Sequence, residues 1–413
     1  MQRTKLPDTL NNINQNNGLR VLHKSLDDAW GGFLRDAPAA RGAAGACCTA
    51  AAAVRATLFA RRAPRLRYSA GCGLGAAISQ RPFLDPPMHD PTVRPRVLVA
   101  RAAFPDILAE LESVADVEYT ADDHIDTPQQ LRVRLADKHG AFITNSERID
   151  AALLDACPQL RVVSTMTVGV DHIDLAACAA RGVVVTHAPD VLTETTADFG
   201  FALLLAAARQ MADAERYLRA GRWRQWSYGL FAGADVHATT LGIVGMGRIG
   251  QAIARRAVHG FGMRVLYHNR HRLDDAREAQ YQAAWRTLPE LLDESDHVVL
   301  ALPYSASVRH LIGAPQLAQM RPGATLVNVA RGGVVDEAAL AAALREGHLG
   351  AAGLDVFEGE PAVNPLLLQA PRLVLTPHIA SASVPTRRAM VKLAVDNLVA
   401  VLQGRAPLTP AGA

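Results

Sequence analysis

Three side chains with complementary chemistry lie in one stretch of the C-terminal half of the chain. They are a guanidinium (Arg331), a carboxylate (Glu358 or Glu360) and an imidazole (His378), in the segments NVARGGVVDE, GLDVFEGEP and TPHIAS. A permanent cation suits the binding of a carboxylate, and an imidazole beside a carboxylate suits proton transfer. Spacing alone does not choose between the two glutamates. The stretch therefore predicts a site that binds an anion and moves a proton.

A glycine-rich loop upstream predicts a dinucleotide site. The segment TLGIVGMGRIGQAIARRA has glycines at 245, 247 and 250, with a β-branched strand before them and an amphipathic helix after them. In that context Gly245 permits a tight turn, Gly247 lets backbone amides approach a pyrophosphate, and Gly250 allows close helix–strand packing. The start of the helix adds partial positive charge for the phosphates.

The end of the following strand indicates which nicotinamide cofactor binds. An NAD enzyme presents an acid about 20 residues past the glycines, whereas this chain has His268-Asn269-Arg270-His271-Arg272. Arg270 and Arg272 can bind a 2′-phosphate with charge-assisted hydrogen bonds, and Asn269 replaces the acid that would repel it. We therefore expect NADP(H) to be favoured over NAD(H), the alternative being that both arginines are simply solvated.

Short apolar runs alternate with amphipathic stretches from residue 96 onward, which is typical of parallel α/β sheets. The first series of expected strands is 97–100, 142–144, 162–165 and 183–187, followed by a long apolar helix from Thr195 to about Ala220. A second series of six comprises 240–244, 264–267, 297–302, 325–329, 351–356 and 372–375, with helices such as 248–259 and 336–346 between them. This second series predicts a Rossmann unit. A final helix at 384–402 is expected to return to the first domain.

The N-terminal segment differs in composition from the rest. Residues 1–87 begin Asn/Gln-rich, and an Ala/Arg-rich tract over 37–84 contains no acidic residue. This composition resembles a transit peptide, although it is not at the extreme N-terminus. We favour the alternative that Met88 is the true first residue. In either case we expect residues 1–87 to be a disordered extension outside the main fold.

Composition limits the classes of function. The chain has 413 residues, of which 49% are hydrophobic and 20% charged, and no apolar run is long enough to cross a membrane. Beyond residue 87 it carries 31 Lys and Arg against 35 Asp and Glu, a balance of −4 that does not favour nucleic-acid binding. The five cysteines have neither metal nor disulfide spacing. These observations predict a cytoplasmic enzyme that works reduced and holds no metal.

From about residue 96 to 402 the chain resembles the D-isomer-specific 2-hydroxyacid dehydrogenase family. Within it, the likeness is greatest to bacterial glyoxylate/hydroxypyruvate reductases that also reduce 2-ketogluconate. The strings that carry the resemblance, in the expected order, are STMTVGVDHID, VLTETTADF, TLGIVGMGRIG, NVARGGVVDE, AAGLDVFEGEP and TPHIAS. The resemblance implies a flavodoxin-like substrate domain (88–192 plus 379–413), a Rossmann domain (193–378) that binds NAD(P), and an active-site cleft between them.

The resemblance also implies roles for the three side chains. Arg331 would bind the substrate carboxylate and polarise the keto oxygen, and His378 would protonate that oxygen as hydride arrives from the nicotinamide. The family pattern places the catalytic acid directly before Pro361, which selects Glu360 to hydrogen-bond the imidazole and stabilise its charged form. The backbone amides of Val168 and Gly169 would hold the substrate carboxylate.

Further expectations concern the cofactor, the pocket and the partner. The remaining cofactor contacts are expected at Met246, Arg248, Ile249, Leu302, Pro303, Val329, Ala330 and Asp355. Asp355 would lie near the carboxamide or near His378, with a strand-end cap as the alternative. Val170 and His172 stand where relatives often have an aromatic residue and Asn, which leaves the pocket size open.

Trp223, Trp226 and Tyr228 lie in a region that related enzymes use at a dimer interface, the alternative being that they are ordinary core aromatics. The predicted function is NADPH-dependent reduction of glyoxylate, hydroxypyruvate or 2-ketogluconate to a D-2-hydroxy acid by a homodimer, with no nucleic-acid or membrane partner. One alternative is an NAD-dependent D-2-hydroxyacid dehydrogenase of other specificity. The other is a cofactor-sensing scaffold of the corepressor type.

Overall fold

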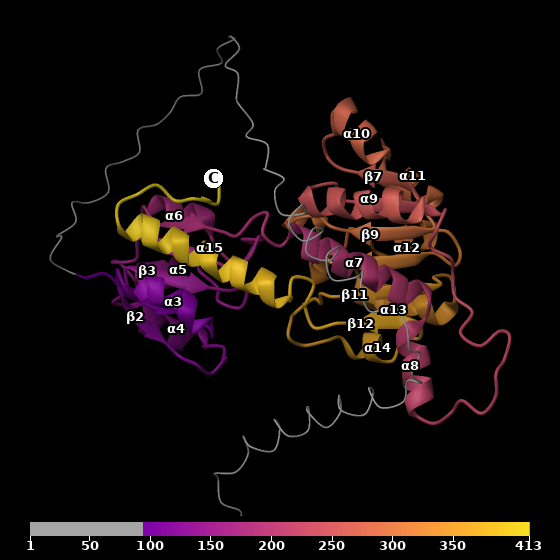
Figure 1. Cartoon of the computed structure of the whole chain (residues 1–413), viewed down its shortest axis with the longest axis horizontal. Coiled ribbons are helices and arrows are strands. Elements are labelled where there is room, and N and C mark those ends of the chain that lie inside the picture. Colours follow the sequence, from indigo (N-terminus) through magenta and orange to yellow (C-terminus); the bar gives the residue numbers. More distant parts are fainter. Residues whose placement is uncertain (1–93, 413) are drawn as a thin grey trace, which may run out of the picture. The chain divides into compact units, whose positions relative to one another are not determined.

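The computed structural model describes residues 94–412, which belong to one unit of the chain. The expectations about residues 1–87 lie outside the described residues. Two separate parallel sheets with helices packed on them make up the described chain (Figure 1). This confirms the predicted pair of α/β domains.

The first sheet has five parallel strands in the order β2-β1-β3-β4-β5, which is the flavodoxin-like order. Its strands are β1 (Arg96–Val99), β2 (Asp116–Tyr119), β3 (Gly140–Ile143), β4 (Val162–Thr165) and β5 (Val184–Thr186), and its helices are α3 (Pro105–Glu112), α4 (Pro128–Leu135), α5 (Ala151–Asp155) and α6 (Leu175–Ala180). The central strands β3 and β4 are fully buried, as apolar runs in a sheet covered on both faces should be. Strand β2 was missed because its sequence, DVEY, is only partly buried at the sheet edge.

The second sheet has seven parallel strands in the order β12-β11-β10-β9-β6-β7-β8. Its strands are β6 (Thr240–Val244), β7 (Arg264–His268), β8 (Ala283–Trp285), β9 (His297–Leu300), β10 (Thr325–Asn328), β11 (Ala351–Leu354) and β12 (Leu373–Leu375). Its helices are α7 (Thr193–Ala208), α8 (Met211–Arg219), α9 (Arg248–Phe261), α10 (Asp275–Tyr281), α11 (Leu288–Glu294), α12 (Ala314–Gln319), α13 (Glu337–Glu346) and α14 (Pro365–Leu368), with 3₁₀ turns at Ala306–Val308 and Gly332–Val334. All six expected strands form, but the prediction of six was wrong by one, because the missed strand β8 is the third strand of the Rossmann order 3-2-1-4-5-6. The extra strand, β8, is three residues long and adds to the sheet edge beside β7.

The long apolar helix expected from Thr195 to Ala220 is two helices instead. Gln210 adopts a left-handed conformation (φ 52°) between α7 and α8, which ends the helical hydrogen-bond pattern there. Helix α7 buries its apolar face against the second sheet, whereas α8 buries none of its residues. The chain therefore changes from core helix to surface helix at this point.

The last helix, α15 (Val384–Leu402), packs against α3, β3 and β4 of the first sheet (Figure 1). Its Leu398 belongs to the same buried cluster as Phe142 and Val162, and the Ser164 hydroxyl donates to the Ala394 carbonyl at 2.9 Å. Thr386 on α15 also shares a 2.6 Å hydrogen bond with Thr195 on α7. The residue limits that we expect for the two domains stay a prediction.

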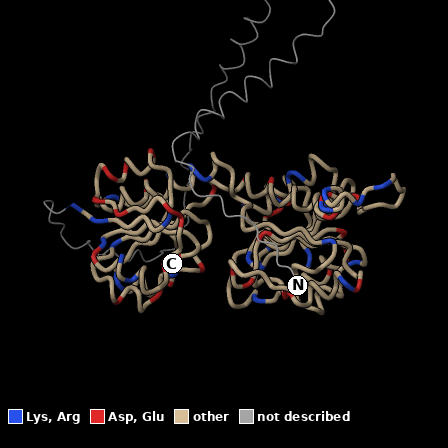
Figure 2. Tube along the Cα trace, turned by 90° about the horizontal axis from the view of Figure 1, so that it is seen from below, with Lys and Arg blue, Asp and Glu red and all other residues tan. Residues whose placement is uncertain are grey.

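Acidic and basic residues are interspersed along the described chain and are not segregated (Figure 2). None of its helices combines the length and the apolar character needed to traverse a lipid bilayer. Among residues 94–412 no group of three or more His, Cys, Asp or Glu side chains is placed to hold a metal ion.

Candidate active site

The carboxyl ends of the strands in the second sheet gather most of the expected site residues along one edge. In sheet order these ends lead to Asn269 after β7, Gly245 after β6, Leu302 after β9, Arg331 after β10, Asp355 after β11 and His378 after β12. The strand order reverses between β6 and β9, and ligands bind at such a switch point in open α/β sheets. The fold thus supplies a common location for residues that are far apart in the sequence.

The glycine loop has the geometry that pyrophosphate binding requires. Gly245 has φ +102°, and a Cβ there would lie 2.6 Å from the Ala301 backbone, so only glycine fits. A Cβ at Gly250 would lie 2.2 Å from the Gly245 carbonyl oxygen, which shows how closely α9 approaches the turn. A Cβ added at Gly247 would meet nothing within 4 Å, and no side chain caps α9. The first N–H groups of α9 therefore have no capping side chain and suit a phosphate.

The other expected cofactor residues differ in their burial and in the partners that they already have. The Met246 N–H already donates to the Asn269 side chain at 2.7 Å, and Arg248 forms an ion pair with Asp190 at 2.6 Å. Ile249 is partly buried and packs in the core, and Val329 and Ala330 are buried. Leu302 is half-buried and Pro303 is exposed at the end of β9.

Arg331 lies directly over the loop expected to hold a carboxylate. A Cβ on Gly169 would fall 1.9 Å from Arg331 Nη2, so the glycine is needed for this approach. The guanidinium donates from Nε and Nη2 to Asp171 Oδ1 at 3.2 and 3.1 Å, and from Nη1 to the Ala330 carbonyl at 2.9 Å. One N–H on each terminal nitrogen is left for another acceptor. Burial would raise the pKa of Asp171, but the Arg331 charge outweighs it and holds that pKa below its ordinary value.

The loop after β4 is held in place by its own hydrogen bonds. The Thr167 hydroxyl donates to the Gly169 carbonyl at 2.7 Å, and His187 Nδ1 lies 2.9 Å from the Val168 carbonyl oxygen. Both expected amide donors, Val168 and Gly169, are therefore in a braced loop beside Arg331. The adjacent His172 is largely buried, and burial lowers its pKa to about 4, so it is neutral at physiological pH.

His378 and Glu360 form a close pair. His378 Nδ1 lies 2.7 Å from Glu360 Oε2, and both side chains remain about one-third exposed, at 33% and 28%. Burial would raise the pKa of Glu360, but the hydrogen bond and charge of His378 hold it below its ordinary value. Glu358 instead accepts hydrogen bonds from Arg309 and His310, each at 2.8 Å. Of the two glutamates, only Glu360 contacts the imidazole.

Asp355 holds the backbone that carries His378. Its buried carboxylate accepts from the Ile379 and Ala380 N–H groups at 2.9 and 2.8 Å and from the Thr376 hydroxyl at 2.7 Å. The His378 N–H donates to the Asp355 carbonyl at 2.8 Å. His378 adopts a left-handed conformation (φ 52°), which is unfavourable for a residue with a Cβ and needs such support. Of the two expected places for Asp355, near the carboxamide or near His378, the structure has it beside His378.

The sequence reasoning missed Asp171, the carboxylate partner of Arg331. The available signal was an acid two residues after Gly169, within the string VGVDHID. Nothing in the sequence alone shows that Arg331, 160 positions away, reaches it. The pairing depends on contact between segments from the two sheets.

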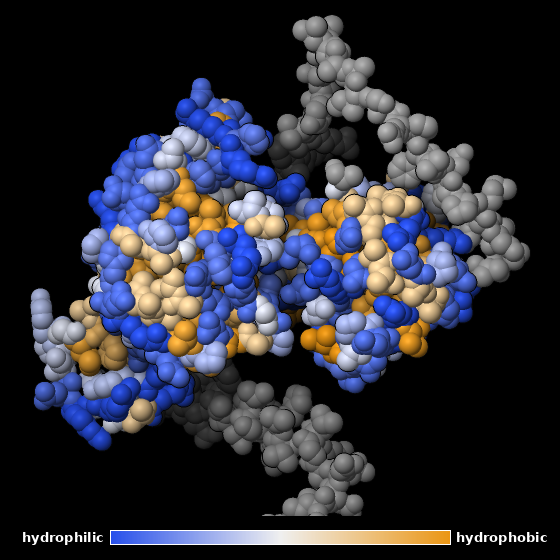
Figure 3. Space-filling view, turned by 180° about the vertical axis from the view of Figure 1, so that it is seen from behind, coloured by the Kyte–Doolittle hydropathy of each residue, from blue (hydrophilic) through white to orange (hydrophobic). Residues whose placement is uncertain are grey.

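The aromatic segment before β6 is exposed. Trp223, Trp226 and Tyr228 are 52%, 75% and 92% exposed, so within this chain they are not core residues. The nearby Met211, Leu218 and Leu230 are exposed as well. The space-filling view shows hydrophobic residues at the surface among hydrophilic ones (Figure 3).

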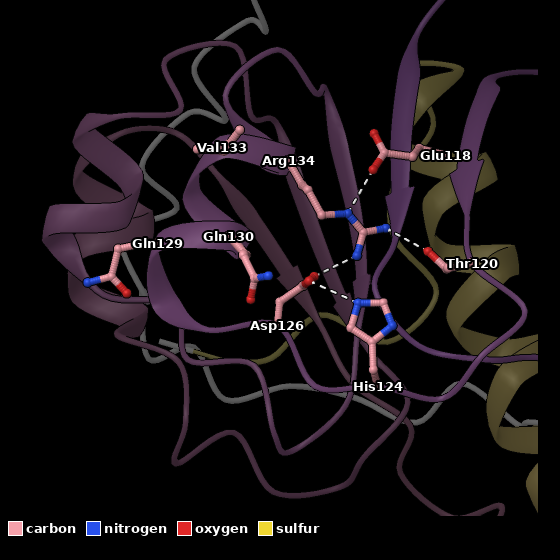
Figure 4. Close-up of a pocket in the computed structure, with 8 residues that line it drawn as sticks. All are labelled: Glu118, Thr120, His124, Asp126, Gln129, Gln130, Val133 and Arg134. Carbon is pink, nitrogen blue, oxygen red and sulfur yellow. Dashed lines mark hydrogen bonds and ion pairs between the residues drawn. The ribbon is translucent and has the colours of Figure 1, made fainter.

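A surface cavity of about 480 Å³ lies elsewhere, beside β2 and α4, and contains none of the expected site residues. Arg134 in this cavity is already engaged by Glu118, Asp126 and Thr120 at 2.7, 2.6 and 3.1 Å (Figure 4). The positive charge of Arg134 is therefore already balanced by carboxylates that line the same cavity.

Comparison with known proteins agrees with this geometry. Residues 201–380 match the NAD binding domain of the D-isomer specific 2-hydroxyacid dehydrogenases. A glyoxylate reductase from Thermococcus gammatolerans is 43% identical over 321 residues, which are 77% of this chain and 96% of that protein. The glyoxylate/hydroxypyruvate reductase B of Salmonella typhimurium is 44% identical over 314 residues, 76% of this chain and 96% of its own.

Solved structures show the same likeness. A protein from Thermus thermophilus has a TM-score of 0.71 at 44% identity and is covered completely, against 77% of this chain. The NADPH-dependent glyoxylate/hydroxypyruvate reductase of Sinorhizobium meliloti, solved in complex with NADP and malonate, has a TM-score of 0.68 at 38% identity, with 97% of it and 78% of this chain covered. The chain therefore belongs to the D-isomer specific 2-hydroxyacid dehydrogenase family.

Proposed function

We propose that this protein reduces small 2-keto acids to D-2-hydroxy acids with NADPH, acting on glyoxylate, hydroxypyruvate or 2-ketogluconate. The observation that carries the proposal is the approach of Arg331 to Gly169, together with the His378–Glu360 pair on the same strand edge. A permanent cation over a glycine loop suits a carboxylate, and an acid–base pair nearby suits the adjacent carbonyl.

In the proposed mechanism, the carboxylate of the substrate accepts hydrogen bonds from the two remaining N–H groups of Arg331 and from the backbone amides of Val168 and Gly169. Asp171 keeps the guanidinium in this orientation through the hydrogen bonds that it accepts from Nε and Nη2. When bound, the nicotinamide supplies a hydride to the carbonyl carbon. His378, whose Nδ1 is held by Glu360, gives the proton from Nε2 to the carbonyl oxygen, and Glu360 stabilises the charged imidazole before that transfer.

The cofactor preference rests on the end of β7. No acid follows this strand at the position where NAD enzymes carry one, and Arg270 is exposed there. The name of the Sinorhizobium meliloti relative as an NADPH-dependent reductase supports this preference, and the names of the other relatives support glyoxylate and hydroxypyruvate as substrates.

We also propose a cytoplasmic homodimer. The exposed apolar side chains of α8 and of the segment 220–232 suit contact with a second copy, because large apolar groups left in water favour association.

The test is a panel of kcat/KM values for the three 2-keto acids with NADPH and NADH, measured on the unaltered protein and on His378→Asn. We expect turnover with NADPH and a loss of at least a hundredfold in the variant, since general acid catalysis contributes about 10²–10⁴-fold. Near-normal turnover of His378→Asn would remove His378 from the mechanism, and a strong NADH preference would favour the NAD-dependent alternative. No turnover on any 2-keto acid would favour a cofactor-sensing scaffold.

A further inference from the structure

The two arginines after β7 have different surroundings, although both were expected to bind the 2′-phosphate. Asn269, directly before Arg270, accepts the Met246 N–H of the glycine loop and is itself contacted by Trp285 Nε1 at 3.2 Å through its carbonyl. The start of this segment therefore lies against the expected pyrophosphate turn. A role for either arginine at the 2′-phosphate rests on the proposed use of NADPH at this site.

Arg270 is the available cation. It is exposed, and within residues 94–412 its side chain makes no hydrogen bond or ion pair. Arg270 directly follows Asn269, which accepts a hydrogen bond from the glycine loop, so the Arg270 backbone lies close to that loop. A phosphate placed there gains a charge-assisted contact without displacing any existing partner.

Arg272 is already engaged by a carboxylate. Its Nε and Nη2 donate to Glu278 Oε1 and Oε2 at 2.7 and 2.5 Å, a two-pronged contact with a side chain on α10 that is only 11% exposed. The Tyr267 hydroxyl also donates to Glu278 Oε1 at 2.6 Å, and it accepts the Leu273 N–H at 2.8 Å. Because Arg272 and Tyr267 both donate to Glu278, the pKa of that carboxyl lies below its ordinary value. The Arg272–Glu278 ion pair therefore has no net charge, and the buried Tyr267 also holds its carboxylate.

We propose that Glu278 is a specificity-determining residue that withholds Arg272 from the cofactor, so that Arg270 alone reads the 2′-phosphate. Arg272 keeps three N–H groups, two on Nη1 and one on Nη2, but the Glu278 carboxylate neutralises its charge and repels a phosphate that approaches them. To gain the full charge of Arg272, the phosphate would have to break both hydrogen bonds and leave a nearly buried carboxylate short of donors, which is costly. Glu278 thereby limits how strongly the site discriminates NADPH from NADH, because it neutralises the second cation of the strand end.

The experiment measures Kd for NADPH and for NADH by titration of cofactor fluorescence, so that no turnover is required. Glu278→Gln keeps the size of the side chain and removes its charge. We expect it to tighten NADPH by about threefold to tenfold, the gain from one freed charge-assisted contact, and to change NADH by less than about twofold. Arg270→Ala should weaken NADPH by about tenfold or more, while Arg272→Ala should change NADPH by less than about twofold.

Asp275→Asn is the matched control, since Asp275 lies 3.8 Å from Arg272 but is 99% exposed. It removes the same charge from the same helix, α10, and should leave both Kd values unchanged. The double variant Glu278→Gln/Arg272→Ala should lose the gain in NADPH affinity that Glu278→Gln alone produces. If Glu278→Gln does not fold, as judged by its thermal transition, Arg272→Ala alone decides.

Two results would overturn the inference. One is a loss of NADPH affinity in Arg272→Ala as large as that in Arg270→Ala. The other is a folded Glu278→Gln variant with unchanged NADPH affinity. Failure of the proposed function looks different, because it concerns the unaltered protein: tighter binding of NADH than of NADPH, or no turnover of 2-keto acids, whatever Glu278 does.

Discussion

At the scale of single residues, the FEGEP segment separates two glutamates that are only two positions apart. Glu360 turns to His378 and also accepts the Phe357 N–H at 2.9 Å, whereas Glu358 turns to Arg309 and His310. Chemically identical side chains thus acquire different roles through their partners. Glu358 is therefore an internal control for Glu360.

Replacing Glu360 by Gln should lower kcat by roughly tenfold or more, because His378 loses the charge that stabilises its protonated form before proton transfer. Replacing Glu358 by Gln should leave kcat within about twofold, since its partners are not expected to touch the substrate. Steady-state kinetics at saturating NADPH measure both. Equal losses in the two variants would contradict the assignment of Glu360.

The Asp171–Arg331 pair should make stability depend on acid pH. The folded-state pKa of Asp171 lies below its ordinary value of 3.8, so the pair contributes fully above that value and is lost as the pH falls through the folded pKa. Against Asp171→Asn, the free energy of unfolding should differ on the order of 1 kcal/mol at neutral pH. The difference should shrink as the pH falls below about 4. Urea denaturation at several pH values measures it, and a difference that grew toward acid pH would be the wrong sign.

Site residues were predictable where a short motif carried them. Arg331, His378 and the three glycines stand in contiguous strings, and each lies after a strand of the second sheet. Asp171 was not found because its partner comes from the other sheet, and no local pattern encodes a contact over 160 positions. Likewise, the ion pair that engages Arg272 depends on how α10 packs.

At the scale of elements, the β6–α9 turn separates a glycine needed for packing from one needed for binding. Gly250→Ala should destabilise the fold by about 1–3 kcal/mol, because its Cβ would lie 2.2 Å from the Gly245 carbonyl oxygen. Gly247→Ala should leave the melting temperature unchanged, since nothing lies within 4 Å, but should raise the Kd for cofactor. Thermal melting and cofactor titration of the same two variants test this. A destabilised Gly247→Ala with normal cofactor affinity would reverse the assignment.

Elements with strong periodicity and clear ends were predictable, and weak ones were not. Helix α15 forms over the expected residues with Ser383 as its N-cap, and α13 begins one residue late because Asp336 is its cap. Strands β2 and β8 are short edge strands whose sequences, DVEY and AAW, have too little apolar pattern. The break between α7 and α8 at Gln210 could not be predicted, because neither Gly nor Pro occurs there.

At the scale of the whole molecule, the exposed aromatic segment predicts the oligomeric state. Trp226→Ser combined with Tyr228→Ser should shift the protein toward monomer, because large aromatic residues in an interface contribute about 2 kcal/mol or more each. Val133→Ser is the control, since Val133 is as exposed as Trp226 at 75% but lies on α4. Sedimentation velocity measures the shift. An unaltered protein that is already monomeric would refute the proposed dimer.

The position of α15 has a consequence for how this chain is made. The helix covers β3 and β4, and its Ala394 follows its β4 partner Ser164 by 230 positions in the chain (Figure 1). Domains generally fold in order as the chain leaves the ribosome. Here the seven-stranded sheet is complete while the five-stranded one still lacks the helix that contributes Met390, Val395 and Leu398 to its core. The sheet that is translated first is therefore the last to be completed, and its apolar face stays uncovered until the final helix is made.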